Sequence, residues 1–195
     1  MRTPDADEVR RLVREAVERS LGPEPGVPSA PKETPRVVSP RSVAIGSDHG
    51  GFELKQVLAR AIREDLGWEV VDVGTHSTDA VDYPDFAAAV GREVASGRVS
   101  RGIVIDSAGI GSTMAANKVA GVRCALCHDD TTVLNAREHN DANVMALGSR
   151  IVNRGAAARM ARLFLTTSFA GGRHERRIRK IMALDSRESA TPGSR

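Results

Sequence analysis

Short apolar, β-branched runs alternate with longer segments of helical periodicity from Ser42 onward. The predicted strands are Val43–Ser47, Glu69–Val73, Gly102–Asp106, Val122–Cys127 and Asn143–Leu147. The predicted helices cover residues 52–65, 85–97, 112–119, 130–138, 155–167 and 173–183. Continuous apolar strands that alternate with helices form parallel sheets covered on both faces. The sequence therefore predicts an α/β fold, with ligands bound beyond the carboxyl ends of the strands.

The first 40 residues have a different composition. None of the six aromatic residues lies in the first 51 positions, and seven of the nine prolines lie in the first 40. Without this segment and the polar end, the 195-residue chain leaves about 145 residues, an ordinary size for one domain. We expect that domain to span residues 42–185, with a disordered tail over 186–195.

Composition and charge exclude several classes of protein. A hydrophobic content of 41% with 27% charged residues is typical of a globular protein. No apolar run reaches the ~18 residues of a membrane span, and no secretory signal is evident, so we expect a cytoplasmic protein. The basic residues gather at Arg173, Arg176, Arg177, Arg179 and Lys180. No aromatic residue accompanies this cluster, which favours a compact anion such as phosphate over a nucleic acid.

Residues 1–21 predict an amphipathic helix. Its apolar residues recur at spacings of three and four: Val9, Leu12, Val13, Ala16, Val17 and Leu21. Thr3 suits the N-cap position and Pro4 the first turn. Residues 22–41 form a Pro-rich linker, which we expect to be extended and poorly ordered. An isolated helix of this length is marginally stable in water, so its apolar face needs a partner.

Two interpretations of that helix remain open. It could dock on its own domain or self-associate. Alternatively, residues 3–21 could recruit another protein. In form, a short amphipathic helix on a Pro/Gly/Ser-rich linker resembles the encapsulation peptides that target enzymes into bacterial microcompartments. That resemblance implies shell or cargo proteins as partners. A membrane-surface helix is disfavoured because its polar face mixes acids with arginines.

The loop from Asp106 to Ser112 follows a predicted strand and opens a predicted helix. Gly109 and Gly111 allow a tight turn, and free N–H groups there attract negative charge. The loop lacks the third glycine of a dinucleotide fingerprint and the lysine of a Walker A loop. Asp106 ends the strand, where its carboxylate could act as a base or merely cap the following helix.

Other residues carry weaker signals. Arg173 and Arg177 share a helix face at a spacing of four and could clamp a phosphate or simply be solvated. His49 and His139 are isolated histidines, although His139 lies in a polar run. The pair Cys124-x-x-Cys127 has the spacing of a redox motif, but residues three apart in a strand point to opposite faces. We therefore expect two separate core thiols.

Several motifs together resemble one family. They are Ser47-Asp48-His49-Gly50-Gly51-Phe52-Glu53-Leu54-Lys55, Val81-Asp82-Tyr83-Pro84-Asp85, Gly109-Ile110-Gly111 with Ala115-Ala116-Asn117-Lys118, Glu138-His139-Asn140-Asp141-Ala142-Asn143-Val144 with Leu147-Gly148-Ser149-Arg150, and Gly171-Gly172-Arg173-His174-Glu175-Arg176-Arg177. In order and over residues 42–184, they resemble ribose-5-phosphate isomerase type B, in the family that includes the galactose-6-phosphate isomerase subunits.

The resemblance implies a three-layer, Rossmann-like fold with a five-stranded parallel sheet. It also implies a homodimer whose last helix reaches toward the partner, and catalysis without a cofactor or metal. The reaction would interconvert an aldose phosphate and a ketose phosphate through an enediolate. We expect ribose 5-phosphate and ribulose 5-phosphate as substrate and product. The reaction would take place inside a microcompartment if the N-terminal helix is a targeting peptide.

The same resemblance assigns roles by position. His139 matches the residue that helps to open the sugar ring, and the loop from Ser107 matches the backbone amides that stabilise the enediolate, a large catalytic effect in general. The remaining matches are substrate contacts at Asp48, His49, Tyr83, Gly109, Ile110, Gly111, Ser112 and Asn140. The phosphate contacts are Arg150, Arg173 and Arg177.

One departure from the family concerns the base. Many members carry a cysteine at the position of Asp106, followed by Gly and Thr at Ser107 and Ala108, and another subgroup uses a glutamate at Ser112. This chain has neither base. Our hypothesis is that Asp106 carries the proton between C2 and C1, since a carboxylate is already ionised at neutral pH. Ser107 or Thr113 would replace the hydroxyl missing at Ala108.

Two alternatives follow from this altered loop. The enzyme could act on a hexose 6-phosphate instead of a pentose phosphate. It could also be a catalytically weak homologue that binds sugar phosphate or scaffolds an assembly. Retention of both histidines and both phosphate arginines opposes the second alternative.

Overall fold

The computed structural model describes Ser39 and residues 41–185. The helix expected over 1–21, the tail 186–195 and nearly all of the linker 22–41 lie outside the described residues. Five strands are present: β1 (Ser42–Ser47), β2 (Glu69–Asp72), β3 (Arg101–Asp106), β4 (Cys124–Leu126) and β5 (Val144–Gly148). The helices are α2 (Phe52–Leu66), α3 (Tyr83–Ala95), α4 (Ile110–Ala116), α5 (Asp130–Glu138), α6 (Arg154–Thr166) and α7 (Arg173–Asp185).

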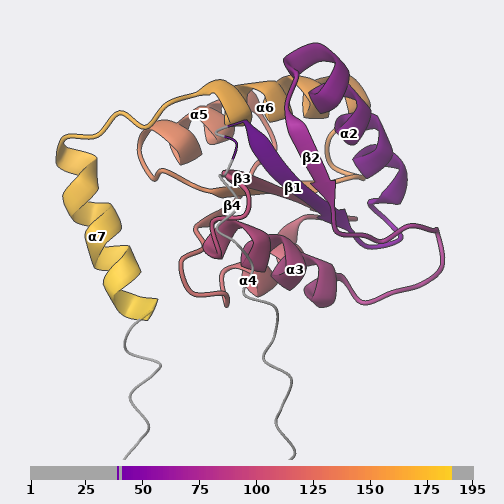
Figure 1. The fold of residues 1–195 in the computed structure, drawn as a ribbon, viewed down its shortest axis with the longest axis horizontal. Helices are drawn as coiled ribbons and strands as arrows, with labels where there is room; N and C mark the ends of the chain where they lie inside the picture. Colours follow the sequence, from indigo (N-terminus) through magenta and orange to yellow (C-terminus); the bar gives the residue numbers. More distant parts are fainter. Residues whose placement is uncertain (1–38, 40, 186–195) are drawn as a thin grey trace, which may run out of the picture. The chain divides into compact units, whose positions relative to one another are not determined.

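All strand pairs are parallel, and the strand order is β2-β1-β3-β5-β4. Helices α2, α5 and α6 cover one face of the sheet, and α3 and α4 cover the other (Figure 1). The predicted three-layer, Rossmann-like α/β fold with a five-stranded parallel sheet is therefore confirmed. Because every strand runs the same way, all their carboxyl ends meet at one edge.

Two apolar cores lie on the two faces of the sheet. The side of α2, α5 and α6 buries a cluster that includes Ile45, Ile105 and Phe164. The side of α3 and α4 buries a smaller cluster built around Val90 and Val104. The alternation of side chains along each strand divides the residues between these two cores.

The two cysteines follow this alternation. Cys127 belongs to the first core, whereas Cys124 packs against the second, and both thiols are free. The prediction of two separate thiols is confirmed, and the redox interpretation of the motif is excluded by their opposite directions.

Some element boundaries differ from the predicted ones. Helix α3 begins at Tyr83 because Asp82 is an extended N-cap and Pro84 fits the first turn. Helix α4 begins at Ile110, two residues early, after Gly109 with φ of 80°. Strand β4 is shorter than expected, since only three of its residues pair with β5 at the edge of the sheet.

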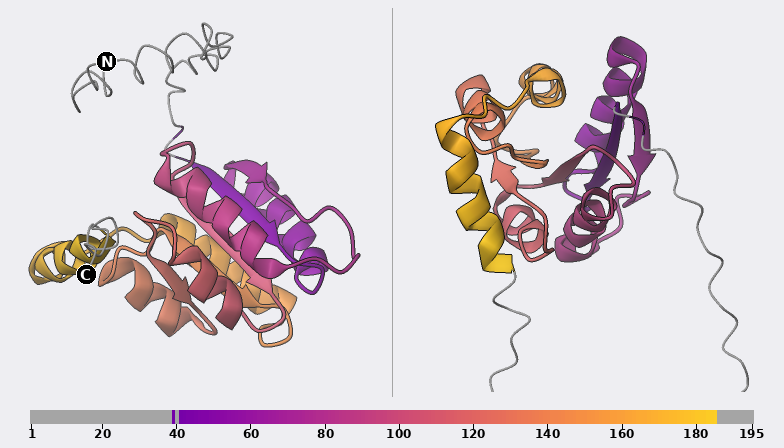
Figure 2. Two further views of the ribbon diagram at one scale, coloured as in Figure 1. Left: turned by 90° about the horizontal axis from the view of Figure 1, so that it is seen from below. Right: turned by 60° about the vertical axis from the view of Figure 1, so that its left-hand side comes forward.

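Helix α7 lies outside the three layers (Figure 2). It contacts the segment before β4, where the Arg123 guanidinium lies 3.2 Å from the Met182 sulfur and the Gly121 N–H donates to the Asp185 carboxylate at 2.9 Å. Its apolar residues Ile181 and Leu184 are exposed. No helix within residues 41–185 combines the length and apolar character that a membrane span needs.

Candidate active site

The carboxyl ends of β1, β3 and β5 bring a first set of predicted residues together. The Asp48 N–H donates to the Ile105 carbonyl at 3.2 Å, and the Ser149 N–H donates to the Asp106 carbonyl at 2.8 Å. The Arg150 N–H donates to the Ser107 carbonyl at 3.1 Å. We call Asp48, His49, Tyr83, Asp106–Ser112 and Arg150 the strand-end group.

Asp106 lies at the centre of the strand-end group, with its side chain almost fully buried. Its Oδ1 accepts hydrogen bonds from the N–H groups of Ala108, at 2.8 Å, and Gly109. Its Oδ2 accepts one from the Ser112 N–H at 3.0 Å. A carboxylate oxygen can accept two hydrogen bonds, so Oδ2 retains one lone pair that no donor among the described residues contacts. Asp106 thus organises the loop through both of its carboxylate oxygens.

Two other N–H groups of the loop have no hydrogen-bond acceptor in the described part of the chain. Among the described residues, no acceptor faces the N–H groups of Ile110 and Gly111. The Thr113 hydroxyl donates to the Gly109 carbonyl at 2.6 Å, which leaves Ser107 as the hydroxyl better placed to exchange protons. The Ser112 hydroxyl is buried without a hydrogen-bond partner in the described part of the chain.

Tyr83 and His49 border this loop. A Cβ added to Gly111 would lie 2.7 Å from the Tyr83 hydroxyl oxygen, so the phenol ring rests directly on the loop. The Val81 N–H donates to His49 Nδ1 at 3.3 Å, which leaves Nε2 as the protonated nitrogen of a neutral ring. His49 and Arg150 line one cavity of about 310 Å³ with Ser149 and Arg154.

A second set of predicted residues lies around the end of α5. His139 stacks on His174 of α7, with ring centroids 4.4 Å apart and planes 6° apart. The Asn140 side chain donates to the Asn135 side chain, and Asn135 contacts His139 Nδ1 at 2.9 Å. Arg173 Nε lies 3.5 Å from His174 Nε2. We call Asn135, His139, Asn140, Arg173, His174 and Arg177 the histidine group.

Buried charges fix the loop that follows His139. Arg137 is 1% exposed and donates to the Ala142 carbonyl at 2.6 Å and to Asp141 Oδ1 at 2.9 Å. Asp141 has φ of 43°, a left-handed conformation that aspartate tolerates better than most residues. The Arg123 guanidinium donates to the Asp141 carbonyl as well. These contacts hold His139 and Asn140 in place.

One chain does not bring the two groups together. Asn143, just after the histidine group, accepts a hydrogen bond from the Gly102 N–H at the start of β3. Asp106 ends the same strand four residues later, which is about 13 Å at ~3.3 Å per residue. The histidine group therefore lies at the amino edge of the sheet, and the strand-end group lies at the carboxyl edge.

The histidine group contains two residues that the sequence analysis did not assign. His174 is buried, and the pKa of its ring is lowered by burial first and by His139, Arg173 and Arg177 next. Asn135 precedes His139 by four residues, the spacing of neighbours on a helix face. That spacing was the available signal for Asn135, whereas nothing local predicts the stacking of His174.

A buried carboxylate and loop amides beyond the carboxyl ends of a parallel sheet define a small-molecule site of an α/β enzyme. The sequence profile of the Ribose/Galactose Isomerase family matches residues 43–181. Ribose-5-phosphate isomerase B of Escherichia coli (strain K12) is 40% identical over 149 residues, covering 76% of this chain and 99% of that protein.

Solved structures agree. Clostridium thermocellum ribose-5-phosphate isomerase B is 44% identical with a TM-score of 0.74, covering 76% of this chain and 99% of that one. Trypanosoma brucei type B ribose 5-phosphate isomerase is 45% identical with a TM-score of 0.72, covering 74% and 98%. The chain belongs to the ribose/galactose isomerase family, and the predicted class, an aldose–ketose isomerase, is confirmed.

The thiols are poorly suited to acid–base work. Burial raises the pKa of Cys124 to about 12 and that of Cys127 to about 11. Both side chains are therefore protonated at neutral pH, and neither belongs to the strand-end group. Within the described residues, no three His, Cys, Asp or Glu side chains are placed to hold a metal ion.

We predict that both thiols resist alkylation in the folded protein. The thiolate is the reactive form, and a raised pKa leaves little of it at pH 7.5. Mass spectrometry after treatment with iodoacetamide should find both cysteines unmodified at pH 7.5 and increasingly modified as the pH rises toward 10. Urea-unfolded protein at pH 7.5 is the control and should be alkylated fully. Rapid labelling of either cysteine in the folded protein at neutral pH would contradict the prediction.

Proposed function

We propose that this protein interconverts ribose 5-phosphate and ribulose 5-phosphate through an enediolate. The observation that carries the proposal is the Asp106 carboxylate, buried beside two uncommitted loop N–H groups at the carboxyl edge of the sheet. Similarity over nearly the full length of two proteins named ribose-5-phosphate isomerase B supports a pentose phosphate. The chemistry needs only one base and one loop that stabilises an anion.

In the forward direction Asp106 Oδ2 takes the proton from C2. The electrons of the C2–H bond form the C1=C2 double bond, and O1 gains the negative charge. A proton then moves from O2 to O1, with the Ser107 hydroxyl as the relay. The O2 carbonyl forms as Asp106 returns its proton to C1. Asp106 thus ends each turnover as a carboxylate.

The loop N–H groups fall into two sets, one facing the Asp106 carboxylate and one available to the enediolate oxygen. The N–H groups of Ala108, Gly109 and Ser112 face the Asp106 carboxylate. Those of Ile110 and Gly111 are left for the enediolate oxygen. When the proton moves from C2 to Asp106, negative charge moves from the first set of donors to the second. Preorganised donors aimed at developing charge lower the barrier without further rearrangement.

We predict that Asp106→Asn lowers kcat for ribose 5-phosphate by about 10²-fold or more, the usual contribution of a general base. The amide keeps the shape of the side chain but cannot take a proton from carbon. The coupled assay should be run beside Asp65→Asn, an exposed aspartate of α2 that should retain wild-type turnover. Thermal unfolding and phosphate-ester binding check that the loop remains formed. Undiminished turnover by Asp106→Asn would show that another group is the base.

The same assay separates the alternatives. Faster turnover of a hexose 6-phosphate than of ribose 5-phosphate would favour the hexose enzyme. Binding of sugar phosphates without turnover of any would favour the weak homologue. The commitment of Asp106 to three backbone amides is the observation that keeps this last alternative open.

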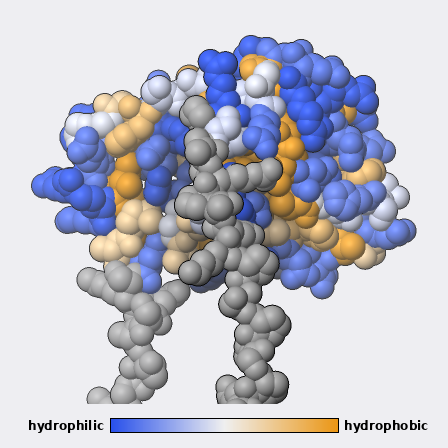
Figure 3. All heavy atoms as spheres, viewed as in Figure 1, coloured by the Kyte–Doolittle hydropathy of each residue, from blue (hydrophilic) through white to orange (hydrophobic). Residues whose placement is uncertain are grey.

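We also propose that the active protein is a homodimer with composite sites. The strand-end group and the histidine group lie at opposite edges of one sheet, so a second copy must supply one of them. Apolar side chains that a partner would cover are Ile181 and Leu184 on α7, 45% and 56% exposed, and Ile110 and Met114 on α4, 52% and 64% exposed. Figure 3 shows hydrophobic surface beside hydrophilic surface along α7.

We predict that two inactive variants restore activity in a mixed dimer. Asp106→Asn and His139→Asn, each carrying a different tag, would be co-expressed and the doubly tagged dimer isolated. Composite sites give one intact and one doubly damaged site, so roughly half of the wild-type rate should return in this two-fold assembly. A site contained in one chain leaves both sites damaged, and the mixed dimer would then be inactive.

Packaging by the N-terminal segment is the last part of the proposal. Residues 3–21 have an amphipathic pattern and are separated from β1 by a Pro-rich stretch. An isomerase of this kind needs no cofactor supply, which suits an enclosed compartment. The partners would be microcompartment shell or cargo proteins.

We predict that residues 1–40, fused to a fluorescent protein and co-expressed with shell proteins, form fluorescent puncta. The apolar stripe is the recognition surface, so Leu12→Glu combined with Val13→Glu should make the fluorescence diffuse. Glu8→Gln, on the polar face, is the matched control and should keep the puncta. Diffuse fluorescence from the unaltered segment would count against packaging.

A further inference from the structure

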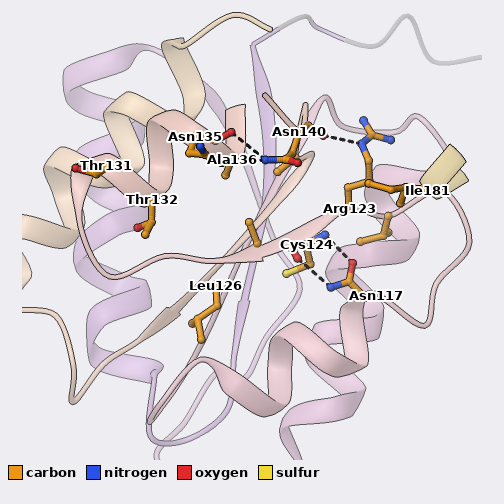
Figure 4. Close-up of a pocket in the computed structure, with 13 residues that line it drawn as sticks. Asn117, Arg123, Cys124, Leu126, Thr131, Thr132, Asn135, Ala136, Asn140 and Ile181 are labelled. Carbon is orange, nitrogen blue, oxygen red and sulfur yellow. Dashed lines mark hydrogen bonds between the residues drawn. The ribbon is translucent and has the colours of Figure 1, made fainter. Parts of the chain in front are cut away.

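The side chains of Asn140, Asn135 and His139 at the end of α5 form a short hydrogen-bonded chain. Figure 4 shows its first part, the contact between Asn140 and Asn135. Asn140 Nδ2 donates to the Asn135 backbone carbonyl at 3.1 Å and to Asn135 Oδ1 at 3.1 Å. Asn135 Nδ2 lies 2.9 Å from His139 Nδ1. Asn135 and Asn140 line a cavity of about 580 Å³ between α5 and α7, together with Asn117, Thr131 and Ile181.

A backbone group sets the polarity of this chain. A carbonyl oxygen only accepts hydrogen bonds, so the atom of Asn140 that faces the Asn135 carbonyl must be its NH₂ group. That NH₂ group also faces the Asn135 side chain, which must therefore present its oxygen there. The remaining group of Asn135, its NH₂, then faces His139. His139 Nδ1 must accept this hydrogen bond and carries no proton.

We propose that Asn135 is a positioning residue that holds His139 as a neutral imidazole with its proton on Nε2. This inference rests on the proposed function for its catalytic meaning, because His139 is the residue assigned to opening the sugar ring. Neutral imidazole with Nε2–H presents a hydrogen-bond donor, not a lone pair, to a substrate. Protonation of Nδ1 would place two donors against each other and break the contact with Asn135.

Groups from α7, α5 and the segment between α6 and α7 surround His139. From α7, His174 stacks on the ring, and the arginines Arg173 and Arg177 add positive charge next to His174. From α5 itself, the neighbouring charges are Arg137 and Glu138. The segment between α6 and α7 packs on Glu138 through the Ala170 N–H and contains no titratable side chain. These groups stack on the ring or lie near it, whereas the hydrogen bond from Asn135 Nδ2 sets its tautomer.

The donor at Nε2 fits one step of the reaction. When the furanose ring of ribose 5-phosphate opens, the C1–O4 bond breaks and its electron pair remains on O4. The O1 proton leaves as the C1=O1 carbonyl forms, and water carries it to O4. Negative charge thus develops on O4 before it is protonated. A fixed N–H at His139 stabilises that charge and would favour ring opening.

Asn135→Asp keeps the shape of the side chain but turns the donor that faces His139 Nδ1 into an acceptor. The carboxylate accepts from Asn140 as before, but it also accepts from a proton on His139 Nδ1. Asn135→Ala removes the contact without reversing it. Asn135 is exposed, so both variants should fold. Thr131→Asp places the same charge on an exposed position of α5, in its first turn, and is the matched control.

The first readout is the protonation of the His139 ring, measured on protein with ¹⁵N-labelled histidine by long-range ¹H–¹⁵N correlation at pH 8. The His139 signals are identified by their loss in His139→Gln. We expect an unprotonated Nδ1 and a protonated Nε2 in the wild type and in Thr131→Asp, and a protonated Nδ1 in Asn135→Asp. A proton on Nδ1 in the wild type, or an unchanged ring in Asn135→Asp, would overturn the proposal.

The second readout is kinetic. We expect Asn135→Asp to lower kcat for ribose 5-phosphate about tenfold, the weight of one hydrogen bond, and to move the acidic limb of its pH profile to higher pH. Asn135→Ala should lower kcat less and leave the acidic limb of the pH profile unchanged. A purely structural role would make Ala at least as damaging as Asp, and that order would overturn the proposal. If the tautomer is found without turnover of any aldose phosphate, the proposed function fails while the assignment of the ring stands.

Discussion

All five strands run in the same direction, and the placement of every functional residue follows from that constraint. In a parallel sheet the loops after the strands gather at one edge, and the loops after the helices gather at the other. Asp48 follows β1 and Asp106 ends β3, so both lie at the carboxyl edge. His139 follows α5 and leads into β5, so it lies at the amino edge. Sequence order within each strand–helix unit thus decides which residues meet at one edge of the sheet and which lie at the opposite edge.

At the carboxyl edge, the Asp106 carboxylate accepts loop N–H groups that would otherwise bond to water or to a bound substrate. Asp106 accepts three backbone N–H groups of the loop that follows it, so the loop is formed before any ligand arrives. A free loop of glycines would lose conformational entropy on binding an anion. The arrangement reconciles the two roles considered for Asp106, because a single carboxylate can cap the loop with three contacts and still offer one lone pair on Oδ2.

The sequence was sufficient for features with local or periodic causes. The apolar runs predicted the sheet, and the strand alternation predicted that Cys124 and Cys127 face different cores. The start of α4 was missed because it depends on the Asp106 carboxylate and the positive φ of Gly109, neither of which shows in hydrophobic periodicity. His139 at the end of α5 and His174 in α7 are 35 positions apart in the sequence, so only the tertiary structure reveals that their rings stack.

The division between the two edges also divides the chemistry. The carboxyl edge holds Asp106, the base in our proposal, and the loop N–H groups, whereas the amino edge holds His139 and the arginines of α7. In a composite site, each active site would take one group of residues from each chain. A monomer would then bind sugar phosphate weakly and turn it over poorly, since neither edge alone both anchors the phosphate and moves the proton. Activity would depend on protein concentration through the dimer equilibrium, and packing many copies into a small volume would favour the assembled, active form.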